Sequence, residues 1–330
     1  MNILFKTILL FFILWTVPIC GYALTISPPL IELELDPGET VAKTIKVLNE
    51  TSEPLKLFLS IEKFRAKGEE GQAEFFSAQE EEYIFYDWIN IKKDPILLMP
   101  QERAEIPFIV TVPKNAEPGG YYSAIFWASS PPNVEDKTAI GVVSKTGTLI
   151  FLKVRGEVNE KGEVLEFNTV NNKHFFSHLP VDFFVRVENL GNIHVKPNGK
   201  IKVINYFNKL TAALNVNVKQ GNILPQSVRR FETSWDAKKS KNSILRKNRN
   251  IFQNFWQELK NEKNNLAFGH YSAYLSLNYG QKEQIARGGL TFWIIPWRII
   301  IVSIIILIIL ILLIKFGIKK YNTWLVTKNM

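Results

Sequence analysis

Cysteine is almost missing from this chain of 330 residues: Cys20 is the only one. It lies in the apolar N-terminal segment, so a chain cut after Ala23 has no cysteine and can form no disulfide. Each domain of such a chain must rest on its hydrophobic core alone. A cysteine-free exterior is unusual for small eukaryotic extracellular domains, so this absence favours a bacterial surface protein.

The sequence also lacks the common catalytic and metal-binding motifs. It has no nucleophile elbow, zinc-protease helix, phosphate loop or calcium loop. His174 and His178 have the spacing H-x3-H, which suits a metal only on a helix, and the Asn-rich segment around them ends in proline and is typical of a loop. We therefore expect no enzyme activity, no cofactor and no metal.

The net charge of +9 does not indicate nucleic-acid binding, because much of it lies at the ends of the chain. Lys6, Arg298 and four lysines near the C-terminus account for six of the 40 basic residues. The remaining 34 face 31 acidic residues, so the middle of the chain is near +3.

Residues 1–23 are predicted to be a signal peptide. They contain Lys6, an apolar run from Ile8 to Val17, and the small residues Gly21 and Ala23 before a cut after Ala23. An uncleaved anchor is the alternative, because one lysine makes a thin charged region. Both alternatives place the following domains outside the cell.

The apolar segment 292–314 is predicted to be a transmembrane helix, since about 20 such residues span a bilayer. Trp293 and Trp297 suit the membrane interface, and Arg298 is expected to snorkel outward. Residues 315–330 contain four lysines and no acid, which marks a cytoplasmic tail. The predicted protein is a single-pass plasma-membrane protein with an N-terminal ectodomain outside.

Between these ends the sequence predicts an all-β ectodomain of two tandem immunoglobulin-like β-sandwiches, residues 24–156 and 157–291. Thr40–Asn49 alternates apolar and polar residues with period two, and similar short runs recur between turn residues. The segment Leu35–Glu39 (LDPGE) predicts a turn in which Gly38 has a positive φ.

One five-residue phrase recurs in the two halves: GYYSA at 120–124 and GHYSA at 269–273. In both halves it follows a turn and opens the second-to-last predicted strand. This place resembles the tyrosine corner of immunoglobulin-like sandwiches, in which a tyrosine hydroxyl bonds to upstream backbone. We therefore predict structural tyrosine corners at Tyr122 and Tyr271.

The second half contains a basic insert, residues 236–267, with eight basic and three acidic residues. Its apolar residues recur at helical spacing and predict a short amphipathic helix. Two interpretations stay open: its aromatic face packs on the sandwich, or it lies on the lipid headgroups. The residues predicted to contact the membrane surface are Lys247, Arg249, Phe252, Phe255 and Trp256.

An acidic and aromatic patch in the first half offers a ligand contact at Tyr83, Tyr86 and Trp88. Paired carboxylates near aromatics, such as Glu81 and Asp87, also keep open a carbohydrate-active enzyme. The simpler interpretation is a solvated loop beside a core strand that Trp88 anchors.

The layout is similar to that of the WxL-interacting proteins of bacterial surfaces, on the phrases ISPPLIELELDPGE, VTVPKNAEPGGYY and VRVENLGNIHV. The resemblance implies a membrane-anchored binding or scaffold protein that contacts cell-wall glycan or other surface proteins. It supplies no matched binding residue, and the basic insert departs from it. The alternatives are an accessory subunit that tethers a secreted enzyme or a pilus-like protein, and the enzyme above.

Overall fold

The computed structural model describes residues 24–77, 84–130, 145–236, 250–280 and 284–328. The predicted signal peptide, Tyr83, Lys247 and Arg249 lie outside these ranges. The chain is mostly β-strand and divides into two compact units. One is formed by Met1–Arg65 and Ala73–Asn159, and the other by Ala66–Gln72 and Glu160–Met330.

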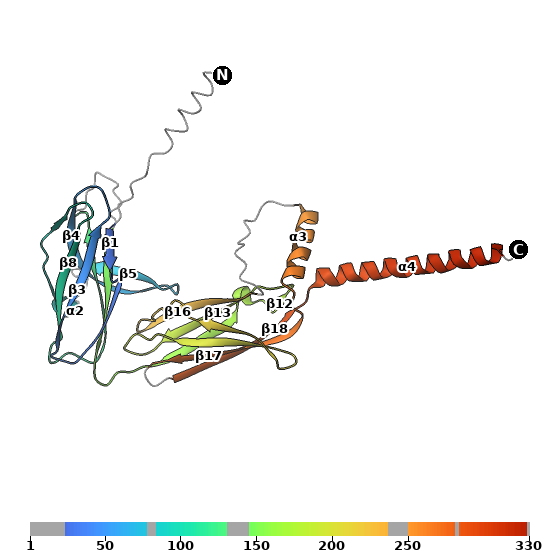
Figure 1. The fold of residues 1–330 in the computed structure, drawn as a ribbon. Coiled ribbons are helices and arrows are strands. Elements are labelled where there is room, and N and C mark those ends of the chain that lie inside the picture. The colour runs from blue at the N-terminus through green and yellow to red at the C-terminus, as the bar shows by residue number, and fades with distance from the viewer. Residues whose placement is uncertain (1–23, 78–83, 131–144, 237–249, 281–283, 329–330) are drawn as a thin grey trace, which may run out of the picture. The chain divides into compact units, whose positions relative to one another are not determined.

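The first unit is a sandwich of two sheets (Figure 1). One sheet has the strand order β1-β3-β8-β6, and the other has the order β2-β10-β9-β4-β5, with β7 paired to β4. Strand β2 runs parallel to β10, whereas β1 is antiparallel to β3. The elements are β1 (Leu24–Ser27), β2 (Leu30–Leu35), β3 (Thr40–Asn49), β4 (Leu55–Lys67), β5 (Gln72–Ser77), α2 (Ile84–Asp87), β6 (Ile89–Ile91), β7 (Ile96–Leu98), β8 (Arg103–Thr111), β9 (Gly119–Ala128) and β10 (Lys145–Val154).

Period-two alternation builds the core of this unit. In β3 the side chains of Ile45 and Val47 are fully buried, while Thr44 and Lys46, which alternate with them, are exposed. Trp127 on β9 is buried in the same core, which lies between the two sheets. The turn before β3 has the predicted form: Gly38 has φ +88°, and the Glu39 amide donates to the Asp36 carbonyl at 3.0 Å.

The second unit has a sheet of order β11-β13-β16 and a sheet of order β12-β18-β17-β14-β15. Strand β12 runs parallel to β18. The strands and the short 3-10 helix are β11 (Gly162–Thr169), η1 (Val170–Asn172), β12 (Phe175–Phe176), β13 (Val181–Asn189), β14 (Asn198–Asn205), β15 (Leu210–Val216), β16 (Ser227–Trp235), β17 (Gly269–Tyr279) and β18 (Gln284–Ile294).

The two units share their strand order except for β6 and β7 of the first unit, which have no counterpart among the described residues of the second. In the sheet that contains the first strand of each unit, this strand pairs antiparallel with the second strand in the sheet order. These pairs are β1 with β3 and β11 with β13. In each unit, a short strand runs parallel to the last strand, which is antiparallel to the one before it. The described part of the chain is therefore an all-β sandwich architecture with a topological repeat.

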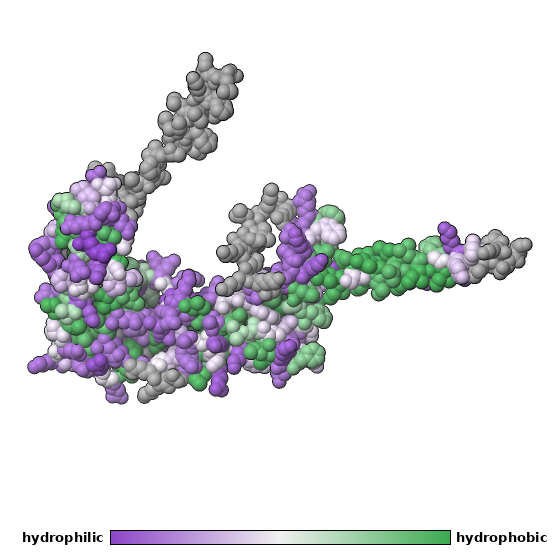
Figure 2. All heavy atoms as spheres, viewed as in Figure 1, coloured by the Kyte–Doolittle hydropathy of each residue, from purple (hydrophilic) through white to green (hydrophobic). Residues whose placement is uncertain are grey.

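Two helices complete the second unit: α3 (Ile251–Asn264) and α4 (Trp297–Lys328). Residues Trp297–Asn322 are long and apolar enough to cross a membrane, and none of that window is buried in the protein. Figure 2 shows the hydrophobic surface along this helix. The 14 residues of α3 are the helical part of the predicted insert.

The predicted start of the apolar helix, at residue 292, is wrong by five residues. Phe292 and Ile294 belong to β18 and are buried in the sandwich core. The helix begins at Trp297, directly after Pro296, whose carbonyl accepts the first helical hydrogen bond from the Ile300 amide at 3.1 Å. The sequence alone did not separate these elements because a buried strand and a membrane helix are both continuously apolar.

Candidate functional site

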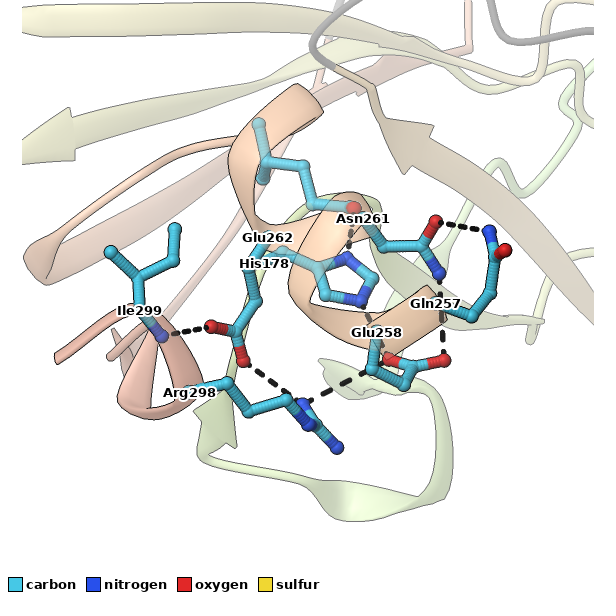
Figure 3. Close-up of polar contacts among 8 residues, drawn as sticks. His178, Gln257, Glu258, Asn261, Glu262, Arg298 and Ile299 are labelled. Carbon is cyan, nitrogen blue, oxygen red and sulfur yellow. Dashed lines mark hydrogen bonds and ion pairs between the residues drawn. The ribbon is translucent and has the colours of Figure 1, made fainter. Parts of the chain in front are cut away.

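A cluster of polar side chains lies where α3 meets the first turn of α4 (Figure 3). Glu262 on α3 is 0% exposed. One of its carboxylate oxygens accepts a hydrogen bond from Arg298 Nη1 at 2.9 Å, and the other accepts one from the Ile299 amide at 3.0 Å. A buried carboxylate is costly unless it is paired, and here both oxygens are satisfied.

This carboxylate acts as an N-terminal cap supplied from another helix. The first amides of a helix have no partner within the helix, and its N-terminus has a partial positive charge. Glu262 satisfies the Ile299 amide and places a negative charge at this end of α4. The contact therefore fixes α3 to the base of the apolar helix.

Arg298 does not snorkel outward as we expected from the sequence. Its guanidinium pairs with Glu262 and lies 4.4 Å from the centre of the Trp297 ring. It also approaches Glu258 at 3.9 Å. The expectation failed because the sequence did not show that α3 brings two carboxylates to this position.

The same face of α3 also contacts the loop before β13 through Glu258. The Nε2 atom of His178 lies 3.2 Å from the Glu258 carboxylate. The Leu179 amide donates to the Asn265 carbonyl, at the end of α3, at 3.2 Å. His178, which the sequence offered as a weak metal ligand, is thus part of the contact that holds α3 to the sandwich. The described residues contain no group of three metal-ligating side chains.

Aromatic side chains surround this junction. Phe255 is half-buried, with its ring 6.4 Å from that of Trp297. Phe252 and Trp256 are mainly exposed, at 72% and 50%, and their rings are 5.9 Å apart. The aromatic face of α3 is therefore divided, with one residue packed at the start of α4 and two residues open.

Sequence reasoning did not identify this cluster, although it contained a signal. Glu258 and Glu262 are four residues apart, which places them on one face of a helix. They are the two carboxylates of α3, in an otherwise basic insert. Their partner Arg298 lies 36 residues beyond Glu262 in the sequence, so only the fold could bring them together.

The two predicted tyrosine corners differ in structure. Tyr271 opens β17 and donates its hydroxyl to the Phe268 carbonyl at 3.3 Å. In the first unit the equivalent bond is made by Tyr121, whose hydroxyl donates to the Glu117 carbonyl at 2.9 Å. Tyr122 lies on the opposite face of β9, with its ring 5.2 Å from that of Phe151. The prediction is corrected by one residue, because the repeated phrase is shifted by one position relative to the sandwich core.

The glycines of the repeated phrase also serve different purposes. Gly269 has φ +121°, a conformation that favours glycine. At Gly120 a Cβ atom would overlap the Tyr122 hydroxyl, so position 120 favours glycine for a steric reason. The resemblance between the two phrases therefore does not extend to their backbone.

Burial changes the acidity of the two core-facing tyrosines. Burial raises the pKa of Tyr121 above its ordinary value, and the nearby Glu117 carboxylate raises it further. Burial also raises the pKa of Tyr271. Both hydroxyls stay protonated at neutral pH and act as donors.

The predicted ligand contact in the first unit is not formed as expected. Trp88 is buried in the core, with its ring 4.6 Å from that of Tyr121, so it cannot stack on a ligand. The Tyr86 hydroxyl accepts a hydrogen bond from Lys93 Nζ at 2.7 Å. Of the three predicted residues, Trp88 anchors the core, Tyr86 contacts a lysine, and Tyr83 lies outside the described residues.

Comparisons with known proteins found remotely similar solved structures. No family model and no curated protein matches the chain. The class 5 fimbriae chaperone CfaA has a TM-score of 0.37 and 13% identity, over 83% of this chain and 100% of that chain. The CupB2 chaperone of Pseudomonas aeruginosa has a TM-score of 0.34 and 10% identity, over 80% of this chain and 97% of that chain. The E. coli chaperone DraB has a TM-score of 0.33 and 10% identity, over 82% and 97%.

Proposed function

We propose that this protein is a single-pass, membrane-anchored binding protein of a bacterial cell surface, with its sandwiches outside the membrane. One observation carries the proposal. The last strand of the second sandwich, β18, leads through Ile295 and Pro296 directly into an apolar helix. Its 26-residue membrane-length segment is not covered by the other described residues. An uncovered helix of this kind needs lipid around it.

The charges on α4 support the proposed orientation. Lys315, Lys319 and Lys320 lie in its C-terminal part, and lysines near the end of a span favour the cytoplasmic side. Trp297 stands at the other end, where aromatic rings favour the membrane interface. In this orientation the lysine-bearing end is inside and both sandwiches are outside.

In the same proposal, α3 lies at the interface between the plasma membrane and the extracellular side. Glu262 and Arg298 hold it at the start of α4, so Phe252 and Trp256 are kept beside the point where the span begins. Exposed aromatic side chains at this level fit the boundary between headgroups and acyl chains. This position of α3 favours the interpretation in which Phe252 and Trp256 contact the membrane, while Phe255 packs on Trp297.

We assign the sandwiches a binding role and not a catalytic one. The most organised titratable side chains at the junction, Glu258, Glu262 and Arg298, are engaged in holding helix ends together. The resemblance to WxL-interacting proteins makes cell-wall glycan or another surface protein the proposed partner. A tethered secreted enzyme or pilus-like protein remains the alternative partner.

The anchor is tested by extracting membranes of bacteria that produce the full chain. Alkaline carbonate should leave the protein in the membrane pellet, whereas release into the supernatant would remove the anchor from the proposal. The interfacial position of α3 is tested with a fluorophore on Phe252→Cys in a Cys20→Ser background. Nitroxide lipids should quench it, while the same probe on Lys219→Cys, an exposed loop position, should stay bright.

The binding role is tested by sedimentation of the detergent-solubilised full chain with purified cell-wall sacculi. Co-sedimentation supports the glycan as partner, while recovery of one secreted protein in place of sacculi supports the tethering alternative. Glycan turnover that is lost in Glu81→Gln or Asp87→Asn would contradict the non-catalytic assignment.

A further inference from the structure

The second sandwich has a polar groove on the outer surface of its five-stranded sheet. The groove has a volume of about 770 Å³ and is lined by residues of β14, β17 and β18 and of the adjoining loops. Four of the lining side chains are cationic: Lys196, Lys200, Lys202 and Arg287. No carboxylate is among the lining residues.

Strand alternation places these side chains on one face. In β14, Ile201 and Val203 are fully buried, so Lys200 and Lys202 face outward. In β17, Ala273 and Leu275 are buried, and Tyr274 and Ser276 are exposed. The cationic face is therefore a direct consequence of the pattern that builds the core.

The strand register arranges the groove in rows. Lys200 is paired with Ser276, which is paired with Arg287 on the next strand. Neighbouring strands lie about 4.8 Å apart, so Lys200 and Arg287 flank the Ser276 hydroxyl at a separation on the order of 10 Å. Lys202 stands one row further, at a spacing of about 7 Å along β14.

Three of the four cations that line the groove have no carboxylate partner within the described chain. Lys200, Lys202 and Arg287 form no ion pair with any described carboxylate. Several like charges in one concave surface repel each other and attract an anion. The spacing of the charges suits a chain that has repeated negative groups.

An aromatic platform accompanies the charges. The Tyr274 side chain is 53% exposed and is paired in register with Lys202 on one side and Gly289 on the other. A Cβ atom at Gly289 would lie against the Tyr274 ring at 3.7 Å, so glycine leaves that part of the ring open. A flat ring between hydrogen-bonding and cationic groups suits a sugar ring with anionic substituents.

The described residues of the corresponding sheet in the first unit form a different outer face. Its outer face contains Phe64, Phe126 and Phe151, which are buried in a group of aromatic rings. The aromatic outer face of this sheet in the first unit therefore differs from the cationic outer face of its counterpart in the second unit.

We propose that this groove binds a phosphodiester-linked, sugar-bearing polymer of the cell envelope. Lys200 and Arg287 contact successive phosphates, Ser276 donates a hydrogen bond between them, and Tyr274 packs against a sugar ring. The proposal names the ligand class of the binding role above and rests on it, since a cell-envelope polymer requires the second sandwich to be outside.

The experiment measures binding of the full chain, held in nanodiscs of neutral phosphatidylcholine, to glucosylated poly(glycerol phosphate). The double variant Lys200→Gln/Arg287→Gln should bind at least tenfold more weakly. The matched control, Lys209→Gln/Lys219→Gln, removes two exposed lysines of the same unit outside the groove and should change affinity less than twofold. Binding of the original chain should weaken as salt rises, because exposed charges are screened.

Tyr274→Ala separates sugar recognition from charge alone. It should weaken binding to the glucosylated polymer several-fold and leave binding to unsubstituted poly(glycerol phosphate) nearly unchanged. Unaltered thermal melting of each variant shows that the fold is kept. An unchanged affinity in Lys200→Gln/Arg287→Gln would overturn the proposal.

Two further binding measurements, with duplex DNA and with anionic vesicles, test other classes of ligand. Equal or tighter binding to duplex DNA of the same charge, or to vesicles with anionic lipids, would also overturn it, because the groove would then recognise charge or a membrane and not a glycan. Incorporation into nanodiscs is measured first. A chain that does not incorporate contradicts the anchor, whereas a chain that incorporates but does not bind the polymer contradicts only the groove.

Discussion

Asn49 and Asn189 occupy equivalent positions in the two sandwiches. Asn49 is the last residue of β3 and Asn189 is the last residue of β13, and both are fully buried. The Asn49 side-chain amide donates to the Glu53 carbonyl at 2.8 Å, and the Asn189 amide donates to the Ile193 carbonyl at 2.8 Å, four residues on in both cases. Both side-chain oxygens accept from the backbone amide two residues on.

Each amide also joins this loop to a distant segment. Asn49 donates to the Leu98 and Met99 carbonyls, and Asn189 donates to the Ile223 carbonyl at 2.9 Å. The two asparagines are thus at equivalent positions of the structural repeat, whereas Tyr122 and Tyr271 of the repeated phrase are not. The burial of Asn49 also leaves no access for a glycan at its Asn-Glu-Thr sequon.

Replacement of either asparagine by alanine should be strongly destabilising. Asn49→Ala or Asn189→Ala leaves buried backbone carbonyls without a donor, at a cost of about 3 kcal/mol in the free energy of unfolding. The measurement is urea unfolding of the full chain in detergent, followed by tryptophan fluorescence. Asn90→Ala, at an exposed position on β6, should change the value by less than about 0.5 kcal/mol. Equal losses at buried and exposed sites would contradict this role.

The tyrosine hydrogen bonds predict a smaller effect. Tyr121→Phe and Tyr271→Phe keep the ring and remove the bonds to the Glu117 and Phe268 carbonyls, so each should cost about 1 kcal/mol of unfolding free energy. Tyr206→Phe, at an exposed turn, is the control and should have almost no effect. The same urea measurement checks the result, and a loss confined to Tyr206→Phe would refute the assignment.

The raised pKa values of Tyr121 and Tyr271 predict instability in alkali. Unfolded tyrosine titrates near about pH 10. The folded state holds these protons more tightly, so their contribution is complete below that pH and is lost as pH rises through the folded pKa values. The free energy of unfolding should therefore fall above about pH 10, and the double variant Tyr121→Phe/Tyr271→Phe should reduce this fall. Identical pH profiles for both proteins would show that other groups cause it.

The pair of Glu262 and Arg298 should hold α3 in place. Glu262→Ala or Arg298→Ala leaves a mainly buried partner without its counter-charge, and each should cost about 3 kcal/mol. The double variant should cost less than the sum, because the two side chains interact directly. Hydrogen exchange should show lower amide protection along α3 in both single variants but not in Lys260→Ala on the same helix. Full protection of α3 in Glu262→Ala would mean that other contacts hold it.

Regular patterns in the sequence were sufficient for the β-architecture. Alternating residues such as those of Thr40–Asn49 predict a strand with one buried face, and the Gly38 turn follows from the conformational freedom of glycine. The apolar helix was also visible from its composition. Its start was not, since the apolar residues Phe292 and Ile294 of the core strand continue into it.

Contacts between distant residues could not be predicted from one sequence. The position of Arg298 depends on Glu262 in another helix, and the role of His178 depends on Glu258. The choice between Tyr121 and Tyr122 depends on which face of β9 packs against the other sheet, and neighbouring tyrosines satisfy either choice in the sequence. The basic groove depends on the register of β14 with the hairpin of β17 and β18, which lies far from β14 in the chain.

The central claim is that α4 crosses the membrane with the sandwiches outside. Because the chain has a single cysteine, accessibility can be mapped in a Cys20→Ser background with one introduced thiol at a time. In intact bacterial cells, a membrane-impermeant maleimide should label Lys219→Cys in the second sandwich, whereas Asn329→Cys at the C-terminal end should be labelled only after lysis. Labelling of both positions in intact cells, or of Asn329→Cys alone, would contradict the account.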